Sequence, residues 1–363
     1  MTTITIPEVA DAARRAIESP RPAVAAVWPC STWWHRVQAV LLVAGVVLEG
    51  TLIVRPEIGV IILWNVLIPV APALLVIAPG LWRNICPMAT LSLLPRYLCL
   101  SHELVPSRWA ADLLALLGFL ALLLIVPLRH LALDISGPAT ALMLLLAATV
   151  AFALGIAFEW RSGWCTSLCP IHPVEKLYGF APALTVGNAR CQSCAKCSTP
   201  CPDSTQAMTP LVTGPSRLAK WLGQVLVGGF VGFIWGWYRL PDYPGPVATN
   251  DILAAYLWPL GGGAASLVAY AALRRQCRSR QARALLPRVF AAAAVSTYYW
   301  YRLPALVGYG PHPGTGMLYD LTGALPAWAP LASHLMTSAF FAWFLLLRAR
   351  PKASWMVRPE LQH

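Results

Sequence analysis

Hydrophobic residues run in long stretches from residue 37 to residue 347, and short polar segments separate them. A helix needs about 20 mostly apolar residues to cross the hydrocarbon core of a membrane. The stretches near that length are 37–54, 58–82, 109–128, 138–160, 218–238, 250–273, 286–307 and 328–347. The pattern therefore predicts an all-α polytopic membrane protein with about eight transmembrane helices.

Proline and glycine are expected to modify two of these helices. The second predicted span contains Pro69, Pro72 and Pro79, and a proline removes a helical hydrogen bond, so this helix should be kinked or locally unwound. The sixth contains three consecutive glycines at 261–263, which allow two helices to pack closely.

The composition agrees with a membrane protein. Hydrophobic residues make up 58% of the chain and charged residues 12%, against roughly 25% charged residues in a soluble domain. The 16 Trp residues fit aromatic belts at the two membrane interfaces. The net charge of +12 is spread between apolar segments rather than gathered on one soluble face, so we expect a lipid bilayer and no nucleic acid as partner.

The Lys and Arg residues predict the orientation, because cytoplasmic loops carry an excess of them. With the N-terminus inside, 23 of the 27 Lys and Arg residues fall on one side of the membrane. The four on the other side are Arg55, Arg129, Arg239 and Arg302. This pattern predicts a multi-pass protein of the bacterial inner membrane with both termini in the cytoplasm.

The predicted spans divide the chain into five segments. They are a cytoplasmic N-terminal segment (1–36), two helix pairs (37–160), a cytoplasmic cysteine-rich loop (161–217), four further transmembrane helices (218–347) and a cytoplasmic tail (348–363).

The cysteine-rich loop contains a ferredoxin-type motif. The sequence Cys191-Gln-Ser-Cys194-Ala-Lys-Cys197-Ser-Thr-Pro-Cys201-Pro has the C-x₂-C-x₂-C-x₃-C-P spacing of bacterial ferredoxins. Three closely spaced thiolates can wrap three corners of a cubane, and the proline turns the chain away from it. The spacing predicts a [4Fe–4S] cluster held in a ferredoxin-like loop.

Zinc is the main alternative for these thiolates. Zinc sites usually use two separated C-x₂-C pairs, however, and the trailing C-x₃-C-P has no use in them. A disulfide framework does not suit a loop that the charge pattern places in the cytoplasm.

Two further cysteine motifs follow predicted helices on the same side. The fourth span leads into Trp164-Cys165-Thr-Ser-Leu-Cys169-Pro, and the second leads into Trp82-Arg-Asn-Ile-Cys86-Pro. Aligned on Cys-Pro, Trp82 stands where Cys165 stands. We interpret the pair as an internal repeat of two helix pairs, each of which delivers a Cys-Pro motif to the membrane surface. The alternative for Cys86 is an ordinary buried thiol.

Two helix pairs that end in Cys-Pro motifs and precede a ferredoxin run resemble the NapH/NosR group of membrane-bound ferredoxin-type proteins, which includes CcoG and MauN. The resemblance covers about residues 37–210. This chain differs from the group in three respects. It has one ferredoxin run where many relatives have two, its first Cys-Pro motif lacks the leading cysteine, and the resemblance does not extend to the helices of 218–347.

The resemblance implies an electron-transfer subunit, similar to a quinol dehydrogenase, that relays electrons between the quinone pool and a partner oxidoreductase. The alternative is an accessory factor that supplies reducing equivalents for the assembly or reactivation of another metalloenzyme. The expected cofactors are one or two [4Fe–4S] clusters, with quinone as a further candidate, and the expected partners are quinone or quinol and a redox protein.

The seven cysteines of the three motifs are the predicted cluster ligands. In two-cluster ferredoxins the fourth cysteine of a run ligates the other cluster. By that logic Cys191, Cys194 and Cys197 share a cluster with Cys169 or Cys86. Cys201 then joins Cys165 and the remaining Cys-Pro thiolate on a second cluster, completed by Cys30, Cys99, His172 or an open iron. The alternative is a single cluster, held by the four cysteines of the ferredoxin run or with one helix-end cysteine among its ligands.

Aromatic and polar residues are concentrated near the last two spans, on the side opposite to the cysteines. They are Tyr298, Tyr299, Trp300, Tyr301, Arg302, His312, Tyr319, Asp320 and His334. An interfacial aromatic belt explains most of them. A quinone or partner-docking site is the second hypothesis.

Overall fold

Helices account for nearly all the regular structure in the computed structural model, which describes residues 32–158, 163–187, 189, 216–348 and 356–357. In the first half these are α2 (Thr32–Val54), α3 (Pro56–Val60), η2 (Ile61–Leu67), α4 (Ile68–Ile77), α5 (Pro79–Ile85), α6 (Pro87–Tyr97), α7 (Arg108–Leu128), η3 (Arg129–Leu133) and α8 (Gly137–Ala157). The elements labelled η are π-helical turns.

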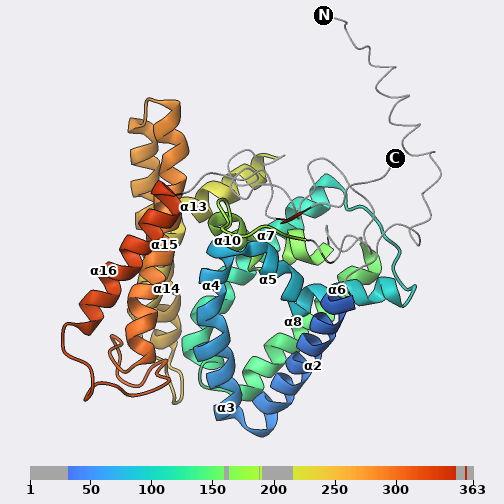
Figure 1. Cartoon of the computed structure of the whole chain (residues 1–363), viewed down its shortest axis with the longest axis horizontal. Helices are drawn as coiled ribbons and strands as arrows, with labels where there is room; N and C mark the ends of the chain where they lie inside the picture. Colours follow the sequence, from blue (N-terminus) through green and yellow to red (C-terminus); the bar gives the residue numbers. More distant parts are fainter. Residues whose placement is uncertain (1–31, 159–162, 188, 190–215, 349–355, 358–363) are drawn as a thin grey trace, which may run out of the picture.

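The second half begins with η4 (Trp164–Leu168) and α10 (His172–Tyr178). It continues with β1 (Val186–Gly187), α13 (Arg217–Trp237), α14 (Thr249–Gln276), α15 (Arg280–Leu306), α16 (Ala329–Ala342), η5 (Trp343–Leu347) and β2 (Met356–Val357). Figure 1 shows α13–α16 side by side in one half of the molecule and α2–α8 in the other.

Seven helices among the described residues are long and apolar enough to cross a membrane. They are Trp33–Val54, Pro56–Ile77, Arg108–Leu133, Gly137–Ala157, Arg217–Trp237, Thr249–Gln276 and Ala329–Leu347. Large hydrophobic side chains stay exposed along them, which suits contact with lipid. The prediction of an all-α polytopic membrane protein is therefore confirmed, and the seven helices coincide with seven of the eight predicted spans.

The eighth predicted span, 286–307, forms α15, which is 27 residues long but more polar than the other seven. At 1.5 Å per residue it measures about 40 Å, enough to cross the hydrocarbon core. Its polar side chains Ser296, Tyr299 and Arg302 are buried. Tyr299 donates to the Pro69 carbonyl on α4, and Arg302 donates to Trp64 and Asn65 in η2, so this helix does not need an apolar surface all round.

The second predicted span is interrupted as its prolines led us to expect. A π-helical turn, η2, precedes Pro69, which cannot donate a backbone hydrogen bond. The helix then ends at Ile77, and Ala78 takes a non-helical conformation before Pro79 begins α5. The break separates the membrane span from the short helix that carries the first cysteine motif.

Glycines form the contact between α13 and α14. A Cβ on Gly232 would collide with the carbonyl oxygen of Gly262, and one on Gly236 would collide with that of Trp258. The two backbones thus touch directly, which confirms the close packing predicted for the 261–263 run.

Substituting Gly232 with Ala should therefore destabilise the protein by about 1–3 kcal/mol, the usual range for overpacking. The matched control is Gly261→Ala, since nothing lies within 4 Å of a Cβ at that position. SDS-induced unfolding of the detergent-solubilised protein, followed by tryptophan fluorescence, measures both. Equal stability of the two variants would contradict the backbone contact.

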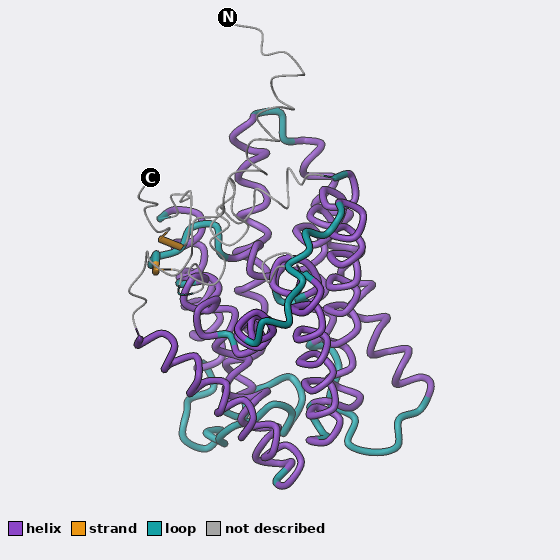
Figure 2. The backbone as a smooth tube through the Cα atoms, turned by 90° about the vertical axis from the view of Figure 1, so that its right-hand side faces the viewer, coloured by secondary structure: helices purple, strands orange, loops and turns teal. Residues whose placement is uncertain are grey.

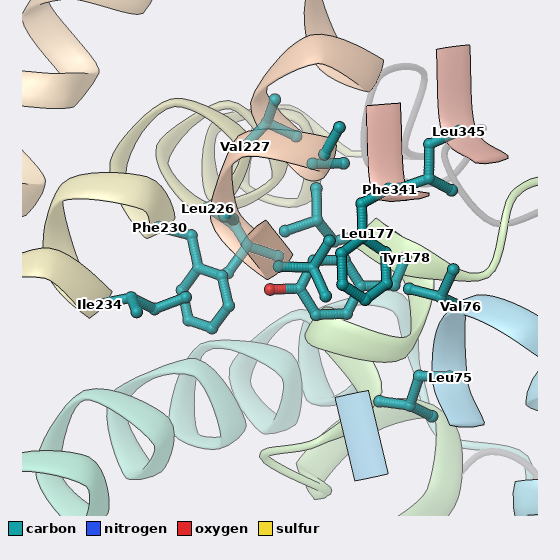
Figure 3. Packing of buried hydrophobic residues seen from close by; sticks show 14 of the residues in the cluster. Leu75, Val76, Leu177, Tyr178, Leu226, Val227, Phe230, Ile234, Phe341 and Leu345 are labelled. Carbon is teal, nitrogen blue, oxygen red and sulfur yellow. The ribbon is translucent and has the colours of Figure 1, made fainter. Parts of the chain in front are cut away.

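One large hydrophobic core joins the two halves (Figure 3). It brings together α4, α10, α13, α16 and η5, with labelled side chains Leu75, Val76, Leu177, Tyr178, Leu226, Val227, Phe230, Ile234, Phe341 and Leu345. Leu177 and Tyr178 are among the most completely buried side chains. The short helix α10, which follows the second Cys-Pro motif, is therefore fixed in place by the core.

The helices run between two ends of the bundle (Figures 1 and 2). In Figure 1, α5 and α10 lie just above α4, below the level of the turn between α14 and α15, and the loop after α15 lies at the lower end. A two-stranded parallel pair, β1 with β2, joins Val186 to Met356 and Gly187 to Val357. Of the predicted non-membrane segments, residues 1–31 and most of the cysteine loop and the tail lie outside the described residues.

Candidate functional site

The two Cys-Pro motifs have the same local structure. Cys86 follows α5 with φ −61° and ψ 118°, and Cys169 follows η4 with φ −59° and ψ 120°. A residue before proline is restricted to such extended angles. In both motifs a short helix follows the cysteine: α6 begins at Pro87, and α10 begins two residues after Pro170. This correspondence agrees with the internal repeat expected from the sequence.

The structure brings Cys86, Cys165 and Cys169 into one hydrophobic cluster. Cys165 is buried against α6 and α8, where Ala89, Leu93 and Ala151 are its neighbours in the cluster, and Cys86 and Cys169 pack at its edge. The Cys165 sulfur also lies 4.0 Å from the hydroxyl of Ser92. Two helix ends, some 80 residues apart in sequence, thus contribute Cys86, Cys165 and Cys169 to the same hydrophobic cluster, at the end of the bundle that holds α5 and α10.

The sulfur of Cys169 has a specific environment. Burial raises the pKa of its thiol to about 12, and neighbouring Cys86 contributes to the rise. The backbone N–H groups of Ile171 and His172, which follow Cys169 in the chain, oppose part of this rise. Such N–H donors stabilise a sulfur that carries negative charge. The site therefore combines two adjacent thiols with backbone donors suited to a metal-bound thiolate.

A buried ion pair holds the two Cys-Pro motifs together. The Nε of Arg83 donates to Oε1 of Glu175 at 2.7 Å, and both side chains are about 5% exposed. Arg83 lies three residues before Cys86, and Glu175 lies on α10, six residues after Cys169. The pair therefore links the helix end of the first motif to the helix that follows the second.

His172 extends this ion pair. The Nη2 of Arg83 lies 2.9 Å from the Nδ1 of His172, and arginine can only donate, so Nδ1 accepts. The Oε2 of Glu175 is 3.8 Å from Nδ1, too far for a hydrogen bond. Burial lowers the pKa of His172 to about 4, and the charges of Arg83 and Lys176 contribute, so the ring is neutral at pH 7 with its proton on Nε2.

Glu175 stays ionised despite its burial. Burial alone would raise its pKa, but the charge and hydrogen bond of Arg83 outweigh that effect and bring the pKa to about 2. At neutral pH the pair is thus a carboxylate and a guanidinium, both removed from water.

Asn84 binds the chain segment that leads to the ferredoxin run. Its amide nitrogen donates to the Gly187 carbonyl at 2.7 Å, and its amide oxygen accepts from the Ala189 N–H at 3.2 Å. The side chain is completely buried. Asn84 lies two residues before Cys86, and Ala189 lies two residues before Cys191. One buried amide therefore connects the first Cys-Pro motif to the start of the run.

The predicted ligands divide into two groups. Cys86, Cys165 and Cys169 are placed together, whereas Cys191, Cys194, Cys197 and Cys201 lie outside the described residues. Within the described part of the chain, no group of three or more His, Cys, Asp or Glu side chains is placed to hold a metal ion. Cys86 and Cys169 could serve as metal ligands together with thiolates of the run.

The other candidate ligands differ in their placement. Cys99 is exposed beyond the end of α6, and Cys277 follows α14, packed against the large core, so neither belongs to the cysteine cluster. Cys30 lies outside the described residues. His172 lies beside Cys169, but its Nδ1 is bound to Arg83, which leaves only Nε2 for another partner.

The nine aromatic and polar residues predicted near the last two spans lie in different environments. Tyr301 is half-buried and stacks on the buried Tyr238, with ring centres 4.8 Å apart. Trp300 instead donates to Ser338 on α16, and it is 39% exposed, as expected of an interfacial belt. Tyr319 is 68% exposed, and Asp320 binds its neighbour Thr322. The nine residues therefore do not form a single site.

Sequence reasoning did not single out Arg83, Asn84 or Glu175. The first two stand inside the W-R-N-I-C-P motif, and a charged residue next to a membrane helix suggests an ordinary interfacial position. The motif itself contains a signal. Its Arg-Asn pair, one residue before the Cys-Pro, is polar although it lies at the end of a hydrophobic helix, where buried polar residues often have a specific role.

Comparison with known protein families, with curated proteins and with solved structures finds no match to this chain.

Proposed function

We propose that this protein is a membrane electron-transfer protein that carries one or two [4Fe–4S] clusters and relays electrons between the quinone pool and a partner oxidoreductase. The observation that supports this most is the meeting of Cys86, Cys165 and Cys169 in one cluster at the end of the bundle where the chain leads into the ferredoxin run.

The local contacts suit a rigid ligand site. Arg83 and Glu175 join the two Cys-Pro motifs, and Asn84 holds the chain two residues before Cys191. Iron–sulfur ligands must be kept at fixed positions, and hydrogen bonds to the sulfurs tune the potential of a cluster. The N–H groups of Ile171 and His172 next to Cys169 lower the pKa of its thiol, as expected of donors near such a sulfur.

The proposed location follows from the charge pattern. The basic residues favour a cytoplasmic position for all three cysteine motifs. Bound there, iron–sulfur clusters would accept and donate single electrons. The hydrocarbon core is about 30 Å thick, so an acceptor on the far side needs a mobile carrier such as quinol.

Metal and sulfide analysis tests the proposal. The protein purified without oxygen in detergent is expected to be brown and to contain about four or about eight iron atoms per chain, with equal acid-labile sulfide. Replacing Cys194 with Ser should lower the iron content and the acid-labile sulfide content by the amount that one cluster contains. The matched control is Cys277→Ser, outside the cysteine cluster, which should keep full iron.

Two results would overturn the proposal. One is about one zinc per chain with no acid-labile sulfide, which points to a thiolate zinc site. The other is full iron and sulfide in Cys194→Ser, because the run would then hold no cluster.

A further inference from the structure

A small cavity lies at the end of the bundle opposite to the cysteine motifs. Its volume is about 20 Å³, enough for one or two water-sized groups and far too small for a quinone ring. It is lined by residues of η3 and the turn after it, the end of α13, the end of α15 and the loop 311–316. That loop follows α15 at the lower end of Figure 1.

The cavity is lined by buried polar groups that have no partner. The Nε of Arg302, the hydroxyl of Tyr238 and the Nε2 of His312 are buried and make no hydrogen bond to any described residue. Arg302 is 4% exposed and Tyr238 6% exposed. An unmade hydrogen bond on a buried donor costs about 1–3 kcal/mol, so such groups normally have a partner.

The guanidinium of Arg302 is held by neutral groups only. Its Nη2 donates to the backbone oxygen of Trp64 and, at 2.7 Å, to Oδ1 of Asn65, both in the π-helical turn η2. No carboxylate of the described chain forms an ion pair with it. A buried cation without an anion is strongly unfavourable.

The other charges around the cavity are already paired. Arg129 binds both oxygens of Asp134, at 2.9 and 3.0 Å. His130 lies 2.7 Å from Asp242 and also contacts the carbonyl of Trp237. Arg129 is in addition covered by the rings of Trp64 and Trp237. The unbalanced charge at the cavity is therefore the positive one of Arg302.

The loop closes directly over this charge. Gly316, with φ +68°, packs against the guanidinium of Arg302, and a Cβ there would collide with Nη1. The glycine thus lets the backbone approach the cation and seal it from the surface.

We propose that this cavity binds a small inorganic anion of about the size of chloride. Arg302 supplies the charge and an N–H donor, and Tyr238 supplies an O–H donor, while His312 can donate from Nε2. Such a site neutralises the buried cation and joins α13, α15 and the loop. It does not depend on the proposed electron-transfer function.

Unfolding in different salts tests the proposal with chloride as the probe. The full-length protein in detergent is heated in sodium chloride and in sodium gluconate at equal ionic strength, since gluconate is too large for the cavity. The unfolding midpoint is expected to rise with chloride concentration, as it does for any ligand that binds only the folded state. Broadening of the ³⁵Cl NMR line by the protein measures binding directly.

Three variants make the test specific. Arg302→Gln should remove the chloride effect and the line broadening. Tyr238→Phe keeps the ring but loses one hydrogen bond to the anion, and should raise the half-saturating chloride concentration about tenfold or more, even if Arg302→Gln does not fold. Arg239→Gln, which removes an exposed cation stacked on Trp235, should behave like the unmodified protein.

Two outcomes would overturn the inference. One is an unmodified protein whose midpoint is the same in chloride and gluconate, which would indicate that water occupies the cavity. The other is a chloride effect that Tyr238→Phe and Arg239→Gln leave equally unchanged, which would place the bound chloride elsewhere.

Discussion

Replacing Glu175 with Gln is expected to lower the free energy of unfolding by about 3–5 kcal/mol, the usual result of removing one partner of a buried ion pair. The variant keeps the shape of the side chain but removes the negative charge that accepts from the Arg83 Nε, deep in the protein. Little of this loss can be recovered by water, because both side chains are about 5% exposed. SDS-induced unfolding in detergent, followed by tryptophan fluorescence, measures the change.

The control for this prediction is a second ion pair at the same end of the bundle. Arg96 and Glu103 are 3.1 Å apart but 21% and 29% exposed, so Glu103→Gln should change stability by about 1 kcal/mol or less. The double variant Arg83→Met with Glu175→Leu should recover most of the loss, since an apolar pair can replace a buried ion pair. Equal effects of Glu175→Gln and Glu103→Gln would contradict a buried, energetically important pair.

The membrane helices could be predicted from the sequence because each of them exposes a long apolar surface. The hydrophobic stretch at 37–54 and the helix Trp33–Val54 share the same C-terminal end, and the other apolar spans agree to within a few residues. Prolines likewise marked the break at Ala78, since proline cannot donate within a helix.

The partners of buried polar groups could not be predicted in this way. Arg302 falls in a predicted span and resembles an ordinary interfacial arginine in sequence. Its contacts with Trp64 and Asn65 join residues more than 230 positions apart. Hydropathy describes one residue at a time, whereas such a contact depends on the packing of two distant helices.

The same reason limits what the sequence says about the cysteine site. Spacing alone identified Cys86, Cys165 and Cys169, because proline and cysteine at a helix end form a local pattern. Asn84 makes its contacts with Gly187 and Ala189, about 100 residues away, and the residues next to it in the sequence do not predict these partners.

Replacing Cys86 with Ala is expected to remove about one cluster's worth of iron and sulfide while the EPR signal of the other cluster remains. This follows from the proposed ligand arrangement, in which Cys86, at the end of α5, binds an iron atom of a cluster. Electron transfer to the partner should be lost as well, because a chain of redox centres fails when one is missing. Iron and sulfide analysis beside the unmodified protein measures the loss.

Cys99→Ala is the matched control, since Cys99 is exposed beyond the end of α6, outside the cysteine cluster, and its replacement should leave iron unchanged. If Cys86 is only a small apolar group, Cys86→Ala should cost about 1 kcal/mol of packing or less and also leave iron unchanged. That result would restrict the ligands to Cys165, Cys169 and the ferredoxin run. Cys86 and Cys169 have the same backbone geometry. With that result, the first copy of the repeat would serve only to position the chain, and the second would supply a cluster ligand.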